Sequence, residues 1–165
     1  MGQTTSFDKI TSRLLRKIEK DKDFFEYYNL SVSEVQSIVM EQAVGYLYDA
    51  IDLLTSKCEP DTDFYDYDEE LLQFNFELTQ REIGLLSSLM YEVYLERDEA
   101  LLKAFKIRMT PSDLNQFSPA NERASFENML QRIKNENTNK IAKYVSTDRK
   151  TGKRKMIDHS QYDYS

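Results

Sequence analysis

The chain has 165 residues and a formal net charge of −7, with four glycines, three prolines, one cysteine and one histidine. A lone cysteine cannot form an internal disulfide or a zinc cluster, and a lone histidine in a polar tail argues against a catalytic triad or a HExxH motif. The few glycines and prolines favour long helices over a barrel or sandwich with many tight turns. We therefore expect one all-α domain that is not an enzyme, with no catalytic residues, no cofactor and no metal.

The first predicted helix follows Ser6, and it carries two stripes at helical spacing. The apolar stripe consists of Phe7, Ile10, Leu14 and Ile18. The basic stripe consists of Arg13, Arg16, Lys17 and Lys20. We interpret the basic stripe as a solvent-exposed face that nearby acids partly neutralise. The alternative is contact with phosphate or with an acidic partner.

A capping box of Ser31 and Glu34 predicts the start of a second helix, which continues to about Lys57. Pro60 then ends the helical pattern and opens an acidic loop at residues 59–73. A run of Asp61, Thr62 and Asp63 begins like a calcium-binding loop. The glycine required at the sixth loop position is missing, so we predict no calcium site.

The stretch from Cys58 to Gln80 contains eight acids and no base. Six of these are candidate docking acids: Asp61, Asp63, Asp66, Asp68, Glu69 and Glu70. Aromatic residues lie between the acids. This mixture is typical of a solvated loop, of an acidic docking surface with aromatic anchors, or of a segment that orders only when it binds.

The third helix start has two matching signals. Thr79 and Glu82 form a second capping box, and Leu78 and Ile83 stand at the positions of a hydrophobic staple. An apolar face follows at helical spacing: Ile83, Leu86, Leu89, Met90, Val93, Tyr94, Leu101 and Phe105. A turn at Pro111 then leads to a fourth helix, with Ser118 as its N-cap and Pro119 at its first position.

The last helix is predicted to end near Tyr144, and a basic C-terminal arm begins at residue 146. The arm has five bases and no acid between Arg149 and Lys155, and these are the candidate partner-binding residues: Arg149, Lys150, Lys153, Arg154 and Lys155. A turn at Thr151-Gly152 predicts a hairpin. We divide the chain into a helical domain at 1–145 and this arm at 146–165, and expect the helices to stay folded without the arm.

The segment from Phe74 to Arg123 resembles the head–tail connector, adaptor or head-completion, proteins of tailed bacteriophages that infect low-GC Gram-positive bacteria. The resemblance consists of short runs: Phe74–Ile83 (FNFELTQREI), Leu89-Met90, Tyr94–Asp98 (YLERD), Leu101–Phe105 (LLKAF), Thr110–Leu114 (TPSDL) and Phe117–Arg123 (FSPANER). The segment that these runs span, residues 74–123, is about a third of the chain.

The resemblance implies a small four-helix bundle that forms a ring, often of twelve copies, beneath the portal protein and next to other neck or tail-completion proteins. DNA would pass through the lumen of this ring without sequence specificity, and no cofactor is implied. The protein would reside in the virion neck, and in the host cytoplasm before assembly. The acids of residues 59–73 would line the lumen or dock a partner, and the basic arm would contact the portal or a neighbouring subunit.

Two other functional classes remain open from the residues alone. Met1 to Ser6 fits the M-G-x-x-x-[ST] lipidation pattern, so a membrane-associated matrix-like module could use Gly2 and the basic stripe. The basic arm could instead bind nucleic acid as part of a regulator. No apolar run approaches the roughly 20 residues of a membrane span, so we expect no membrane-spanning segment, and the adaptor interpretation involves no membrane partner.

Overall fold

The computed structural model describes residues 3–25, 27–108 and 120–156. The fold is mostly helical, as the sequence predicts, and its long helices form a bundle-like body. In chain order the elements are β1 (Thr5–Ser6), α1 (Asp8–Lys17), α2 (Lys22–Phe25), α3 (Val32–Lys57), β2 (Tyr67–Asp68), β3 (Gln73–Phe74), α4 (Gln80–Arg108) and α6 (Ala120–Val145).

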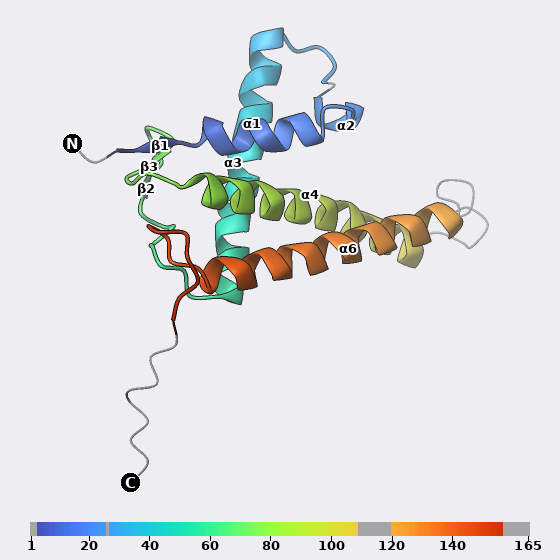
Figure 1. Ribbon diagram of the computed structural model, residues 1–165. Helices are drawn as coiled ribbons and strands as arrows, with labels where there is room; N and C mark the ends of the chain where they lie inside the picture. The colour runs from blue at the N-terminus through green and yellow to red at the C-terminus, as the bar shows by residue number, and fades with distance from the viewer. Residues whose placement is uncertain (1–2, 26, 109–119, 157–165) are drawn as a thin grey trace.

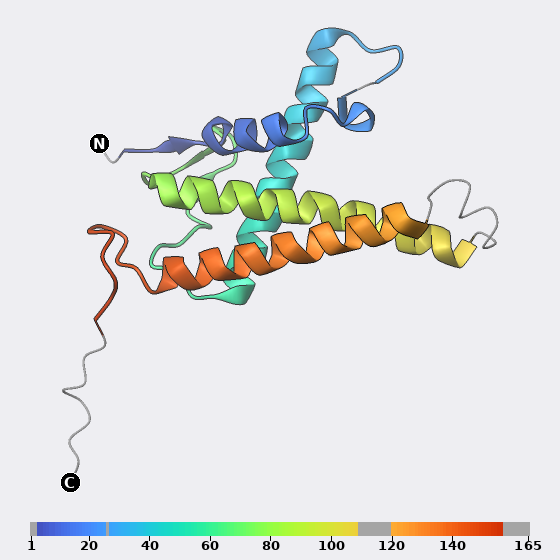
Figure 2. The ribbon, with the colours of Figure 1, turned by 45° about the vertical axis from the view of Figure 1, so that its right-hand side comes forward.

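Helix α4 is the centre of the fold. It lies between α1 and α6 in one layer, and α3 crosses this layer at a steep angle (Figures 1 and 2). The contacts of α4 with α1, α3 and α6 bury its predicted apolar face, including Leu86, Leu89 and Met90. Leu47 and Ile51 of α3 complete the core from the crossing side. Burying one such side chain contributes roughly 1.5–3 kcal/mol, so this packing is the main source of stability.

The two predicted capping boxes are confirmed, whereas the N-cap of α1 is Phe7 and no side chain caps that helix. In α3, the Ser31 hydroxyl accepts a hydrogen bond from the Glu34 N–H, and the Glu34 carboxylate accepts one from the Ser31 N–H. In α4, the Thr79 N–H donates to Oε2 of Glu82 at 2.7 Å, and the Glu82 N–H donates to Oγ1 of Thr79 at 3.3 Å. Leu78, expected to staple the start of α4, is buried.

The acidic segment 59–73 is more ordered than a solvated loop. Its β2 and β3 join β1 in a small antiparallel sheet with the order β1-β3-β2, in which Phe74 pairs with Thr5 and Tyr67. Phe64 and Phe74 are fully buried in the core. Because these aromatic rings bury apolar surface within the chain, the structure favours an ordered segment over the alternatives of a solvated loop and of a segment that orders only on binding.

Several predictions lie outside the described residues: the turn at Pro111, the cap at Ser118-Pro119, the tail with His159, and Gly2. The side chains of Leu101 and Phe105 are likewise not described. Among the helices that are described, none has the length and apolar composition needed to cross a membrane.

Candidate interaction surfaces

The predicted hairpin in the C-terminal arm is confirmed at residues 146–155. Thr147 pairs with Arg154, the Asp148 N–H donates to the Lys153 carbonyl at 2.8 Å, and the Lys155 N–H donates to the Ser146 carbonyl at 2.9 Å. Gly152 has a φ of 69°, a left-handed conformation that side chains with a Cβ disfavour. The turn at Thr151-Gly152 is therefore specified by the local sequence.

Asp148 fixes the start of this turn. Its carboxylate accepts hydrogen bonds from the backbone N–H of Thr151 at 2.6 Å and from the Thr151 hydroxyl at 2.7 Å. These two bonds favour the ionised carboxylate and lower the pKa of Asp148. The hairpin thus keeps its shape at neutral pH.

Arg149 anchors the hairpin to the helical body. Its Nε donates to Oε1 of Glu82 at 2.6 Å and its Nη2 donates to Oε2 at 3.1 Å, which makes a bidentate ion pair. Nη2 also donates to the Glu77 carbonyl, and the guanidinium lies 5.6 Å from the centre of the Phe76 ring. The hydrogen bonds to Glu82 raise the pKa of Arg149.

Glu82 is a shared acceptor at the first turn of α4. Its side chain is fully buried, and besides Arg149 it accepts from the Thr79 N–H and from the Tyr144 hydroxyl at 3.2 Å. Burial and the negative charge of Glu82 both raise the pKa of Tyr144. One capping carboxylate therefore joins the start of α4, the end of α6 and the hairpin.

The candidate partner-binding bases divide into two groups. Arg149 pairs with Glu82, and Lys155 pairs with Asp61 of the acidic segment through a 2.6 Å contact. Lys150, Lys153 and Arg154 are exposed. The structure thus brings the basic arm and the acidic segment together in one chain, a contact that the sequence did not predict.

The candidate docking acids also divide. Asp63 and Asp68 support local turns, since Asp63 accepts from the Tyr65 N–H and Asp68 from the Glu70 and Leu71 N–H groups. Asp66 accepts from the side-chain amide of Asn75, nine positions later. Glu69 and Glu70 are exposed and have no ion pair within the described part of the chain.

Residues 68–72 comprise the last residue of β2 and the turn that leads to β3, and they are called the acidic tip below. Besides Glu69 and Glu70 it exposes Leu71, whose side chain is 66% accessible. Leu72 has a φ of 49°, and its carbonyl accepts a hydrogen bond from the Phe7 N–H at 2.9 Å. The tip therefore combines negative charge and exposed apolar surface on a turn that is held in place.

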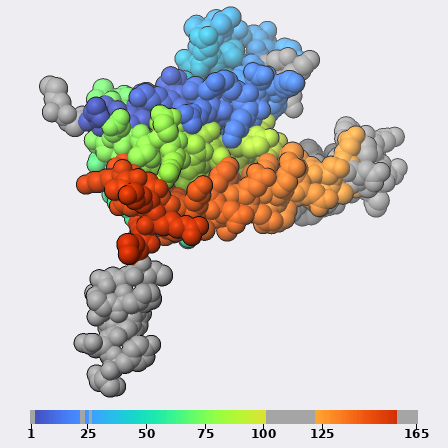
Figure 3. All heavy atoms as spheres, viewed as in Figure 1, coloured from blue at the N-terminus to red at the C-terminus, as the bar shows by residue number. Residues whose placement is uncertain are grey.

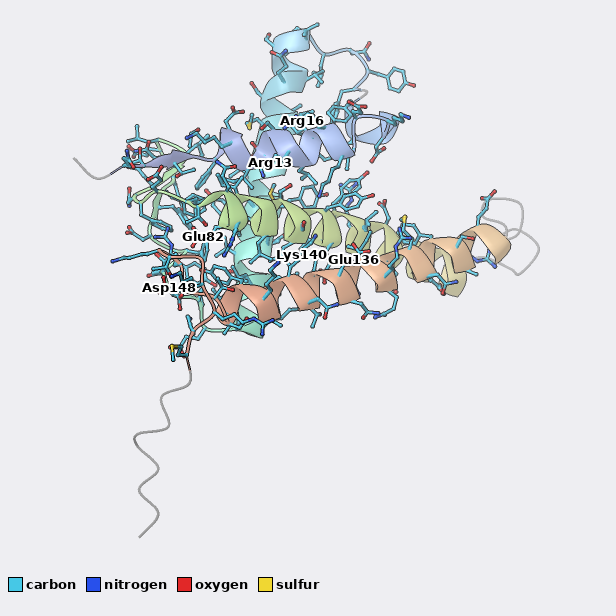
Figure 4. The ribbon with its side chains drawn as sticks, viewed as in Figure 1. Arg13, Arg16, Glu82, Glu136, Lys140 and Asp148 are labelled. Carbon is cyan, nitrogen blue, oxygen red and sulfur yellow. The ribbon has the colours of Figure 1, made fainter. Side chains whose placement is uncertain are left out.

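A pocket of about 310 Å³ lies where the first turns of α4 meet the last turns of α6. Arg81, Lys140 and Lys143 border it, and Leu85 and Tyr144 contribute to its lining. From the other side of α4, α1 adds further cations. Arg13 on α1 and Lys140 on α6 flank α4 (Figure 4), and the α4 surface is visible between the two helices (Figure 3).

We call this surface the cationic groove, defined by Arg13, Lys17, Arg81, Lys140 and Lys143. Lys140 donates to the Ser88 hydroxyl at 2.9 Å, and Arg13 donates to Oε1 of Gln80 at 2.9 Å. The Lys17 ammonium lies 5.4 Å from the centre of the Tyr91 ring. Burial lowers the pKa of Lys17, and the positive charges of Lys140 and Arg13 lower it further.

The sequence pointed to only part of the cationic groove. The basic stripe of the first helix contained Arg13 and Lys17, but nothing indicated that α6 would bring Lys140 and Lys143 to the other side of α4. Helical spacing identifies the residues on one face of a helix, and it does not identify the helix packed next to that face.

The described residues also show the surroundings of the remaining reactive groups. The half-buried Cys58 thiol donates to the Leu54 carbonyl at 3.4 Å, and burial raises its pKa. Across residues 3–25, 27–108 and 120–156, no three His, Cys, Asp or Glu side chains gather as a candidate metal site.

Comparisons of the chain with protein-family models, curated proteins and solved structures find no match.

Proposed function

We propose that this chain is a head–tail connector adaptor of a tailed bacteriophage. In this proposal, copies of the chain form a ring, often of twelve, that docks on the portal protein, meets other neck proteins and joins the capsid to the tail. DNA passes through the lumen of the ring. The chain is then a structural virion protein of the neck, present in the host cytoplasm before assembly.

The observation that carries the proposal is a cluster of exposed cations on a hairpin that is anchored to the helical body. The Arg149–Glu82 ion pair holds the hairpin on the start of α4, so that Lys150, Lys153 and Arg154 are presented at a fixed position. Such a constellation suits docking onto an acidic protein surface, where complementary charge sets orientation and association rate. The motifs from Phe74 to Arg123 support the assignment to connectors.

The docking role of the hairpin can be tested in an assembly assay. Particles that form without this chain are expected to accumulate as DNA-filled heads without tails, and added wild-type protein should restore joining. The variant Lys150→Ala, Lys153→Ala, Arg154→Ala should restore it at least tenfold less well, because it removes three exposed cations and leaves the Arg149 anchor intact.

The matched control is Lys9→Ala, Arg16→Ala, Lys20→Ala, which removes three exposed cations in and next to α1. We expect this control to join heads to tails like the wild type. Equal joining by the hairpin variant and the wild type would show that the hairpin does not dock the portal. Tailed particles that form in the absence of the chain would contradict the proposed function itself.

A further inference from the structure

The cationic groove has the chemistry of a docking site for a short acidic peptide segment. Arg81, Lys140 and Lys143 supply positive charge at its edge, while Leu85 and Tyr144 supply apolar contact within it. Along α4 the lining of its pocket runs from Gln80 to Ser88, which at the rise of an α-helix is about 12 Å. A segment of a few residues that carries both carboxylates and an aliphatic side chain matches this surface.

The lining of the groove favours a protein segment over a nucleic-acid backbone. A phosphodiester chain would use the cations but would leave the surface of Leu85 and Tyr144 without an apolar partner. The chain as a whole also has a net charge of −7, which repels a polyanion as extended as duplex DNA. A short acidic segment avoids most of this repulsion.

The acidic tip has the complementary properties. Glu69 and Glu70 are exposed, and neither makes an ion pair within the described residues. Leu71 beside them exposes 66% of its surface, so the tip offers two carboxylates and one aliphatic side chain over three consecutive residues. The charge and polarity of the tip thus correspond to those of the groove.

The tip is held away from the groove of its own chain. Strand pairing of Asp68 with Gln73 and the hydrogen bond from Phe7 to Leu72 fix it on the sheet, beside the start of α1. The pocket of the groove lies between α4 and α6, and none of its lining residues belongs to the tip. A tip that enters the groove would therefore come from another molecule.

We propose that the cationic groove of one copy receives the acidic tip, residues 68–72, of a second copy. Because each copy presents one tip and one groove, the contact is heterologous and repeats from copy to copy, which generates a closed ring or an open filament. The inference rests on the proposed function in that it identifies the subunit contact of the adaptor ring.

Charge reversal on each side of the contact provides the test. The groove variant is Lys140→Glu with Lys143→Glu, and the tip variant is Glu69→Lys with Glu70→Lys. Each variant alone places like charges opposite each other, which costs several kcal/mol at an interface. We expect self-association of the full chain, measured by sedimentation velocity at low salt, to weaken by at least about 100-fold in each.

Mixing the two variants should restore association. In the mixture, the reversed tip of one variant faces the reversed groove of the other, and the unchanged tip faces the unchanged groove. The control, Lys9→Glu with Lys20→Glu, reverses two exposed charges that line neither the pocket nor the hairpin, and it should associate like the wild type. Lys140 also donates a hydrogen bond to the Ser88 hydroxyl, so its replacement could disturb the fold. Circular dichroism should therefore confirm that each variant folds. Lys143→Glu alone is a milder groove variant that keeps this hydrogen bond.

Four results would overturn the inference. They are a wild-type chain that stays monomeric at all concentrations, unchanged association in both variants, no restoration on mixing, and loss of association in the groove variant alone. In that last case duplex DNA added to the wild type tests whether the groove takes nucleic acid instead. Joining of tails to heads by the wild type is measured separately from self-association. The inference can therefore fail while the proposed function holds, and the proposed function can fail while the contact between copies is real.

Discussion

Replacing Arg149 by alanine should lower the free energy of unfolding by about 2–4 kcal/mol. The substitution leaves the fully buried Glu82 carboxylate without its bidentate cation, and removing one partner of a buried ion pair costs roughly 3–5 kcal/mol. The expected loss is about 1 kcal/mol smaller than this cost because the Arg149 side chain is 24% exposed and because Glu82 keeps its hydrogen bonds from Thr79 and Tyr144. Urea denaturation followed by circular dichroism measures the difference.

Two further substitutions separate the ion pair from the hairpin as a whole. Arg154→Ala changes an exposed base on the same hairpin and should stay within about 0.5 kcal/mol of the wild type. Arg149→Lys keeps the charge but cannot reproduce two parallel hydrogen bonds, so its loss should be intermediate. If Arg149→Ala were as stable as Arg154→Ala, the hairpin would not be anchored through Glu82.

The same ion pair revises the expectation that the helical domain folds independently of the arm. Deletion of residues 146–165 removes Arg149 and therefore leaves Glu82 buried beside Tyr144 without a cation. We now expect this truncated chain to lose at least as much stability as Arg149→Ala. A failure of the truncated protein to join heads to tails would then report unfolding as well as lost contacts.

Replacing Lys57 by methionine should cost about 2–3 kcal/mol. Lys57 of α3 donates to Oε1 of Glu92 of α4 at 3.1 Å, and Asn137 of α6 donates to Oε2 at 2.7 Å. Glu92 and Asn137 are each only 1% exposed, so methionine at position 57 would leave a buried carboxylate with a single donor side chain. The cost falls below that of a fully buried pair because Lys57 is 32% exposed.

A double-mutant cycle with Glu92→Gln isolates this interaction. The Glu92→Gln substitution removes the charge, so Lys57→Met should cost much less in that background than in the wild type. The difference between the two costs should be about 1–2 kcal/mol. Equal costs in both backgrounds would mean that Lys57 stabilises the fold through packing of its aliphatic chain, and not through its charge.

The sequence predicted the helices well because their signals are local. The two capping boxes, at Ser31 and Thr79, involve residues three positions apart, and the structure shows both sets of hydrogen bonds. The turn at Gly152 is local in the same sense, since it depends on a left-handed backbone conformation. Each of these features is determined within a few residues of chain.

The candidate site was predicted less well because it depends on contacts across the chain. Glu82 was identified as a capping residue, yet its pairing with Arg149, 67 positions later, follows only from the docking of the hairpin. Likewise Asp61 and Lys155 are 94 positions apart. Two of the five candidate bases, Arg149 and Lys155, therefore form ion pairs within the chain. Glu69 and Glu70 could be distinguished from the other candidate acids only once the structure showed which acids are hydrogen-bonded or paired.

The location of the chain in intact particles tests the central claim most directly. The measurement is electron microscopy of whole virions in which this chain carries a label at its C-terminus, with unlabelled virions as the comparison. The adaptor account predicts that the added density lies at the junction between the portal and the tail, as a ring around the DNA channel. Label elsewhere in the particle, or particles that lack the chain altogether, would contradict it.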